Sequence, residues 1–249
     1  MSADAFRWPD DCRAAVSVTF DDARPTQLDA GLPILDEFEV KGTFYVVSQR
    51  CLGRVDDWVR AATNGHELGN HSLRHSCSGN FLWEGRNVLE NYTVEQMDEE
   101  LAEASRQIEE LLGVRPKTFA YPCGQTFVGR GIDRRSYVPV VASQFLAGRG
   151  FRDEYLNAPT FVDLAKVGGT EMDRMTWEQI LAHISRAKER GQWVVLVGHD
   201  VRDEGHQGTR CEVLKRICSH CTDPANQVWI DTVANIAQHI QDSRACESG

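Results

Sequence analysis

Two adjacent aspartates and a spaced pair of histidines are the residues best suited to chemistry. Asp21 and Asp22 follow one short apolar run, and His71 and His75 lie four residues apart after another. Two imidazoles and one carboxylate form a common ligand set for a divalent metal, one that leaves positions open for water and substrate. Each signal alone has a structural explanation, because such histidines can pair on a surface and aspartates can cap a helix. Together, at the ends of apolar segments, they predict a metal site.

Short apolar segments that alternate with amphipathic ones must position these side chains. Runs rich in apolar and β-branched residues predict strands over 14–20, 43–47, 66–71, 118–121, 164–167, 193–197 and 228–230. Apolar residues at helical spacing predict helices over 27–38, 56–63, 93–112, 138–146, 176–190 and 232–241. The clearest helix begins at a capping box at Thr93 and ends before Gly113.

This alternation predicts an α/β chain with a parallel sheet. About seven strands in one domain favour a distorted (β/α) barrel over a doubly wound sheet. We expect an N-terminal extension at 1–13, the catalytic barrel at 14–243 and a tail at 244–249. Polar residues end the predicted strands at 21–22, 71, 122–124 and 199–200. Because the carboxyl ends of parallel strands share one face, we expect these residues to converge there.

Composition excludes several classes of protein. The chain has 27 Lys+Arg and 37 Asp+Glu, a formal charge of −10, and no basic block. We therefore expect neither a nucleic-acid partner nor a membrane partner. No apolar run approaches the roughly 20 residues of a membrane-spanning helix. Without a visible leader in 1–11, a cytoplasmic location is expected, with the eight cysteines mostly reduced.

Five motifs make the chain resemble the polysaccharide deacetylases, carbohydrate esterase family 4. Thr19-Phe20-Asp21-Asp22 looks like the first motif of that family, and His71-Ser72-Leu73-Arg74-His75 is similar to the second. Looser matches to the third and fourth motifs lie at 120–124 and 173–177, and residues 196–200 match the fifth motif. The matches occur in the family's order between residues 19 and 200.

The resemblance implies a role for each of the main polar groups. Asp22, His71 and His75 would hold one divalent metal ion, zinc in the first instance, with Co²⁺, Ni²⁺ or Mn²⁺ as alternatives. Asp21 would be the general base, and His199 the general acid that protonates the leaving group. The oxyanion would be stabilised by the metal and by a backbone donor.

That backbone donor would be the N–H of Cys123, in the third motif. The resemblance also marks residues that would line the substrate. Tyr121 and Trp177 hold such positions, and Trp83 lies in a loop, 77–92, whose aromatic residues either pack the loop down or form a wall of the site. The segment 124–159 is expected to form two tight turns around a short helix, or alternatively a loop along the substrate channel.

Two departures from the family pattern concern partners of the acid and the base. Ala120 stands where the third motif has an arginine that pairs with the base, and Thr176 stands where the fourth has a carboxylate that holds the acid histidine. Asp173 or Asp200 is a candidate to hold His199 instead. The candidates for the missing arginine are Arg130, Arg134, Arg135, Arg149 and Arg152.

We therefore predict a metal-dependent hydrolase that removes an N-acetyl or O-acetyl group from a carbohydrate. A cytoplasmic location would favour a small acetylated sugar, a lipid-linked sugar or a nucleotide sugar. A metal-free amidohydrolase similar to the allantoinases is one alternative, although the complete Asp22, His71 and His75 set argues against it. A catalytically silent carbohydrate-binding relative is another, suggested by Ala120 and Thr176. The oligomeric state is not predicted.

Overall fold

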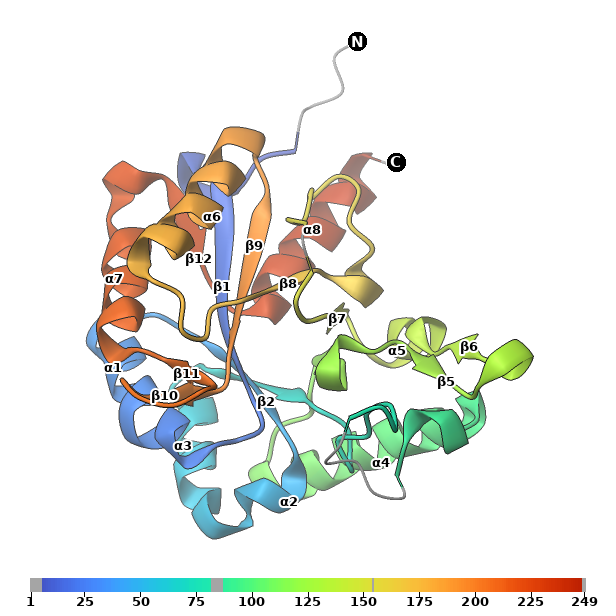
Figure 1. Ribbon diagram of the computed structural model, residues 1–249. Helices are drawn as coiled ribbons and strands as arrows, with labels where there is room; N and C mark the ends of the chain where they lie inside the picture. Colours follow the sequence, from blue (N-terminus) through green and yellow to red (C-terminus); the bar gives the residue numbers. More distant parts are fainter. Residues whose placement is uncertain (1–5, 82–86, 154, 248–249) are drawn as a thin grey trace.

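The computed structural model describes residues 6–81, 87–153 and 155–247. Its main sheet contains the strands Ala14–Asp21 (β1), Thr43–Val46 (β2), Glu67–Asn70 (β3), Thr118–Ala120 (β4), Ala147–Arg149 (β7), Gly169–Glu171 (β8), Trp193–Gly198 (β9) and Val228–Ile230 (β12). All of them pair in parallel, in the order β7-β4-β3-β2-β1-β9-β8, and β12 pairs with the start of β1. Figure 1 shows β1 and β9 side by side at the centre of the molecule.

The sheet's two outer strands, β7 and β8, are joined through Val167, which lies two residues before β8. Gly150 N donates to the carbonyl oxygen of Val167 at 2.7 Å, and Val167 N donates to that of Gly148 at 2.7 Å. Arg149 and Val167 also form a parallel bridge. The seven strands therefore form a nearly closed barrel, which confirms the predicted distorted (β/α) barrel.

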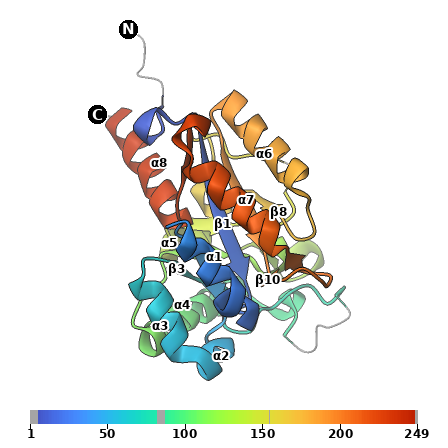
Figure 2. The same ribbon diagram turned by 90° about the vertical axis from the view of Figure 1, so that its left-hand side faces the viewer.

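The helices cover the outside of this barrel, as Figures 1 and 2 show from two directions. They are Leu32–Glu37 (α1), Ser48–Cys51 (α2), Val55–Thr63 (α3), Val94–Leu112 (α4), Val138–Gln144 (α5), Trp177–Arg190 (α6), Cys211–Thr222 (α7) and Val233–Glu247 (α8). A π-helical turn, Gln27–Gly31, precedes α1, so the predicted helix over 27–38 is irregular in its first half. Capping boxes begin α4 and α6, with Thr93 before α4 and Thr176 before α6.

Alternation along β1 decides which side chains point into the barrel. Val16, Val18 and Phe20 belong to the large apolar core between the sheet and the helices. The intervening Ser17 accepts a hydrogen bond from Trp193 Nε1 at 3.1 Å, inside the sheet's concave side. Because side chains alternate along a strand, Asp21 follows Ser17 on this inner side, at the carboxyl end of β1.

Helix α8 closes the opposite end of the barrel. Its residues Val233, Ile236 and Ile240 pack with Trp193 and other apolar residues of the barrel. At this floor, one Glu67 carboxylate oxygen accepts hydrogen bonds from Thr43 Oγ1 at 2.9 Å and from Ala234 N at 2.9 Å. The other accepts a bond from Thr118 Oγ1. Burial raises the pKa of Glu67 against the opposing effect of these hydrogen bonds.

Two sequence predictions near the barrel's seam are wrong. Residues 164–167 were expected to be a strand, but Leu164–Lys166 is a 3-10 turn and β8 begins at Gly169. The stretch around Gly148 was expected to be a tight turn, but it is the strand β7. A Cβ at Gly148 would lie 2.5 Å from the Ala165 carbonyl oxygen, so the glycine allows β7 to pack closely against this 3-10 turn.

Two short strand pairs lie outside the barrel. Phe127–Val128 (β5) and Arg135–Ser136 (β6) form an antiparallel ribbon, and Asp200–Val201 (β10) pairs in parallel with Gly208–Thr209 (β11). No helix within the described residues is long and apolar enough to cross a membrane.

Candidate metal and catalytic site

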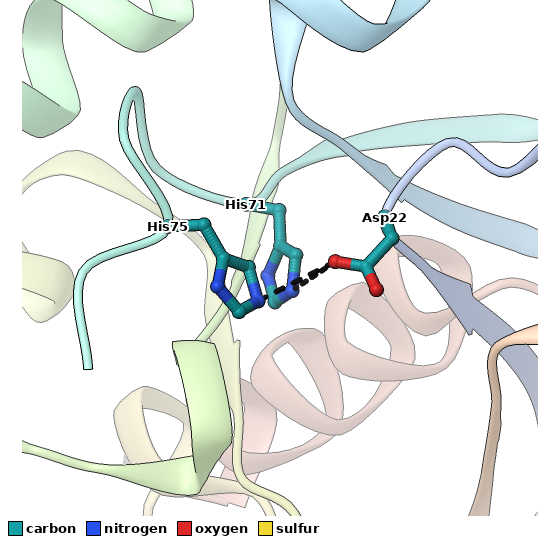
Figure 3. A group of neighbouring side chains, drawn as sticks. All are labelled: Asp22, His71 and His75. Carbon is teal, nitrogen blue, oxygen red and sulfur yellow. Dashed lines mark ion pairs between the residues drawn. The ribbon is translucent and has the colours of Figure 1, made fainter. Parts of the chain in front are cut away.

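The predicted metal ligands come together at the carboxyl end of the barrel. Asp22 follows β1 and His71 follows β3, while His75 lies in the loop beyond. Their ligand atoms all lie within 4.8 Å of one another. Asp22 Oδ1 is 3.4 Å from His75 Nε2 and 3.8 Å from His71 Nε2, and Figure 3 shows the two imidazole rings facing this carboxylate.

The orientation of His71 is fixed by the neighbouring strand. His71 Nδ1 donates to the Ala120 carbonyl oxygen at 2.9 Å, and a carbonyl can only accept. The proton therefore sits on Nδ1, and the lone pair of Nε2 points toward Asp22. This arrangement is the usual one for a metal-binding histidine. Two histidine nitrogens and one carboxylate oxygen thus fit a divalent metal by their chemistry and by their convergence.

Electrostatics keep all three groups in the form that binds metal. Although burial opposes ionisation, His71, His75 and Arg50 hold the pKa of Asp22 far below its usual range, helped by a hydrogen bond from Arg24. Burial lowers the pKa of His71. The pKa of His75 is lowered to about 4, mainly by burial and then by the charge of the nearby His71. At neutral pH the site therefore offers an ionised carboxylate and two neutral imidazoles.

Two arginines contact the two oxygens of Asp22. Arg24 Nη2 lies 2.9 Å from Oδ2, and Arg50 Nη1 lies 2.6 Å from Oδ1, the oxygen that faces the histidines. Arg24 also reaches Asp200 at 2.8 Å, and Thr26 Oγ1 donates to Asp200 as well. Asp200, one of the two candidates to hold His199, is therefore bonded to Arg24 and Thr26. We did not identify Arg24 or Arg50 from the sequence, because neither belongs to a recognisable motif.

Arg149 makes the contact with Asp21 that the missing motif arginine would make. It lies on β7, where its Cα is the register partner of Ala120 on β4. Its fully buried guanidinium donates through Nη2 to Asp21 Oδ1, and through Nη1 to the Gly150 carbonyl oxygen at 2.8 Å. Residues in register on parallel strands point to the same side, so an arginine on either strand can reach Asp21.

Asp173 is the partner of His199. Its Oδ2 accepts a hydrogen bond from His199 Nδ1 at 2.7 Å, and its Oδ1 accepts from the His199 backbone N–H at 3.2 Å and from Thr209 Oγ1 at 3.0 Å. Burial opposes protonation, but the hydrogen bond to Asp173 and the charge of Asp21 raise the pKa of His199. Thr176, in the fourth motif, serves instead as the N-cap of α6.

Cys123 lies in a strained turn held by a disulfide. The turn Pro122–Gly124 follows β4, and Cys123 adopts a φ of 54° there, a value that favours glycine. Cys123 is bonded to Cys77, two residues after His75. This pair is the exception to the expectation that the cysteines are mostly reduced, and the six others are free. The sequence spacing carried no signal for a pair 46 residues apart.

The three expected substrate-lining residues differ in their placement. Tyr121 is fully buried, and its hydroxyl donates to the Ala165 carbonyl oxygen at 2.6 Å, so it packs in the core and does not line the site. Trp177 packs against His220 of α7, with ring centroids 5.4 Å apart. Trp83 lies outside the described residues. A residue that we did not predict, Phe151, packs edge-on against His199 at 5.5 Å.

A family model described as polysaccharide deacetylase matches residues 9–130. This stretch holds β1, the Asp21-Asp22 pair and both histidines of the metal set. Over residues 9–130 the chain therefore resembles the polysaccharide deacetylase family in sequence. The deacetylase signature thus covers the metal ligands and ends before Arg149, Asp173 and His199.

The curated relatives match only part of their own length. The uncharacterized protein YlxY of Bacillus subtilis (strain 168) is 34% identical over 97 residues, which cover 39% of this chain and 27% of that protein. A gellan lyase from a Bacillus species is 26% identical over 148 residues, which cover 59% of this chain and 5% of the lyase.

Solved structures extend the deacetylase fold to nearly the whole chain. A Mycobacterium smegmatis protein described as a polysaccharide deacetylase covers 96% of this chain and 94% of its own, with a TM-score of 0.71 and 19% identity. Puue allantoinase has a TM-score of 0.69 and 15% identity, and the match covers 94% of this chain and 92% of the allantoinase. A family 4 acetyl xylan esterase from Clostridium thermocellum, in complex with cobalt, has a TM-score of 0.58 and 24% identity. This match covers 90% of each chain. At these identities the likeness establishes the fold.

Proposed function

We propose that this chain is a metal-dependent hydrolase that removes an acetyl group from a carbohydrate, acting on an N-acetyl amide or an O-acetyl ester. The observation that carries the proposal is the convergence of three groups of residues at one end of the barrel. These are the Asp22, His71 and His75 ligand set, the Asp21–Arg149 pair and the Asp173–His199 pair.

Asp22, His71 and His75 would hold the metal, which is Zn²⁺ or another divalent ion. Bound there, such an ion supplies positive charge that polarises a carbonyl oxygen and makes water more acidic. Asp21, ion-paired with Arg149 and 3.9 Å from His71 Nε2, is the group beside these ligands that takes the proton of the attacking water.

His199 is the general acid in this proposal. Asp173 accepts the hydrogen bond from Nδ1, so Nε2 is the atom that delivers a proton to the leaving nitrogen or oxygen. The raised pKa of His199 favours its protonated form, which is the form that this step requires. The backbone N–H of Cys123, in the turn anchored by the disulfide, is the proposed protein donor to the oxyanion.

The partners of the acid and the base favour this function over the two alternatives. A silent binding protein was suggested by Ala120 and Thr176, yet Arg149 and Asp173 restore an arginine for the base and a carboxylate for the acid. A metal-free amidohydrolase would not require two neutral imidazoles aimed at one ionised carboxylate. We therefore propose an acetylated carbohydrate as the substrate.

The first experiment measures metal content and acetate release together, on protein purified without a histidine tag. The wild type should hold about one divalent ion per chain and release acetate from acetylated sugars. His71→Ala should lose both. Asp21→Asn should keep the metal and lose acetate release by about 10²–10⁴-fold, the usual contribution of a general base. A wild type that binds no divalent metal after reconstitution would overturn the proposal.

A further inference from the structure

A pocket lies beside the disulfide, and its lining does not include the metal ligands. It has a volume of about 320 Å³, and its wall includes Ser78, Gln125, Phe127 and two arginines, Arg130 and Arg134. Ser78 follows Cys77, and Gln125 lies two residues after Cys123. The pocket is therefore built by the loops that follow β3 and β4, whose carboxyl ends also position His71 and the Cys123 turn. Its volume lies at the lower end of the range for small-molecule sites, about 300–1,000 Å³.

The wall of this pocket is rigidly held. Ser78 N donates to Gln125 Oε1 at 2.7 Å, and Tyr137 Oη donates to the Gln125 carbonyl oxygen at 2.7 Å. The antiparallel β5–β6 ribbon, which projects from the right-hand side of the molecule in Figure 1, carries Phe127. Together with the disulfide, these hydrogen bonds preorganise the pocket, so that its wall would lose little conformational entropy when a ligand binds.

One cation in the pocket, Arg134, has no charged partner among the residues that the structure describes. The Arg134 guanidinium carbon lies 3.5 Å from the centre of the Phe127 ring. Within the described residues, the Arg134 side chain makes no ion pair and no hydrogen bond. Stacking uses the flat face of a guanidinium and leaves its edge N–H donors available, which is the geometry that binds a carboxylate with two parallel bonds.

The other charges of the pocket offset each other. Glu90 accepts hydrogen bonds from Ser78 Oγ and from Gly79 N, the latter at 3.0 Å. Arg130 donates to Asn91 Oδ1 at 2.5 Å, and its positive charge helps to lower the pKa of the Glu90 carboxylate. The charge left over is that of Arg134, in a chain whose formal net charge is −10.

We propose that this pocket is a subsite for an acidic sugar residue, with Arg134 binding its carboxylate and the Ser78 and Gln125 loops contacting its hydroxyl groups. The inference rests on the proposed function in one respect, since it places the acidic residue in the same chain of sugars as the acetylated residue. The substrate class is then an acidic, acetylated oligosaccharide or polysaccharide.

The test compares two tetrasaccharides by isothermal titration calorimetry, on the full chain carrying Asp21→Asn to prevent turnover. Hyaluronan tetrasaccharide alternates glucuronate with N-acetylglucosamine, and chitotetraose contains N-acetylglucosamine alone. We expect about tenfold tighter binding of the acidic tetrasaccharide at low salt, and loss of this preference on adding Arg134→Gln. The control is Arg186→Gln on α6, an exposed arginine without an ion pair in the described part of the chain, which should keep the preference.

Equal affinity for the two tetrasaccharides, or a preference that survives Arg134→Gln, would overturn the subsite. Acetate release by the wild type is measured separately, so that the two proposals can fail independently. Release of acetate without an Arg134-dependent preference would remove the subsite and leave the function. An Arg134-dependent preference without acetate release from any acetylated sugar would remove the function and leave a site for acidic sugars.

Discussion

The two sides of the candidate site are assembled in different ways. The metal side, Asp22, His71 and His75, comes from short segments within the first third of the chain. The acid–base side depends on partners from elsewhere: Arg149 pairs with Asp21 across 128 residues, and Asp173 pairs with His199 across 26. The ligands of a metal can thus be found as local motifs, whereas the groups that set proton affinity are supplied by whichever strand lies next to them in space.

The histidines on the two sides also have opposite electrostatics. His71 and His75 have lowered pKa values because burial dominates, which suits ligands that must be neutral. His199 is also buried, but its hydrogen bond to Asp173 raises its pKa, which suits a proton donor. Different partners thus suit the same residue type to the two proposed roles.

Replacing Arg149 should give the largest effect on the acid–base side. Arg149→Met leaves Asp21 buried without its counter-ion, so we expect the free energy of unfolding to fall by about 3–5 kcal/mol. Acetate release should fall by about 100-fold, while metal content is retained. Denaturant unfolding and the acetate assay measure these effects. The control Arg60→Gln removes an exposed ion pair with Asp57 and should change stability by less than about 1 kcal/mol.

A companion variant tests whether the position of the arginine in space is what counts. Ala120→Arg combined with Arg149→Ala moves the guanidinium back to the register partner on β4. We expect this double variant to recover part of the rate lost in Arg149→Ala. A double variant that folds and remains as slow as Arg149→Ala would show that β7 itself is required.

Asp173→Asn should change the pH profile as well as the rate. His199 must be protonated to act as an acid, so activity falls as pH rises through its pKa. Because Asp173 raises that pKa, its neutral replacement should move the alkaline limb of the kcat/KM profile to lower pH. The maximal rate should fall by about 10- to 100-fold. An alkaline limb at its original pH would exclude His199 as the titrating acid.

Loss of the disulfide should have a smaller effect. Cys77→Ser with Cys123→Ser frees the turn that carries the proposed oxyanion donor, so we expect about tenfold slower acetate release at unchanged metal content. The free energy of unfolding should fall by about 2–4 kcal/mol. Dithiothreitol should affect the wild type in the same way and leave the double variant unchanged. Cys246→Ser, at an exposed free cysteine, serves as the control.

The smallest effect is expected at Arg50 on the metal side. Arg50 lies 2.6 Å from the Asp22 oxygen that faces the histidines, and its side chain is 46% exposed. Arg50→Gln removes a cation that competes for this oxygen, so metal affinity should rise by about threefold, limited by solvent screening. Competition with a fluorescent chelator measures the change. A weaker affinity in this variant would mean that Arg50 supports the ligand geometry.

The sequence predicted the barrel and the convergence of Asp22, His71 and His75, because alternating apolar and amphipathic segments and contiguous motifs carry their own signals. It did not single out Arg149 from five candidate arginines, because neither segment's sequence indicates that β4 and β7 pair or in which register. It also missed β7 itself, whose Ala-Gly-Arg residues lack β-propensity and are held by their neighbours. The disulfide was missed because nothing in the spacing brings Cys77 to Cys123.

Glu67 at the barrel floor has a consequence for the smallest piece of this protein that can fold. Its carboxylate is satisfied jointly by Thr43, by Thr118 and by the first turn of α8. A fragment limited to residues 9–130, the extent of the family match, would lack α8, β7 and β9 and would open both the floor and the seam of the barrel. We expect that fragment to be insoluble, so the deacetylase signature marks where the family is recognised and falls short of an autonomous folding unit.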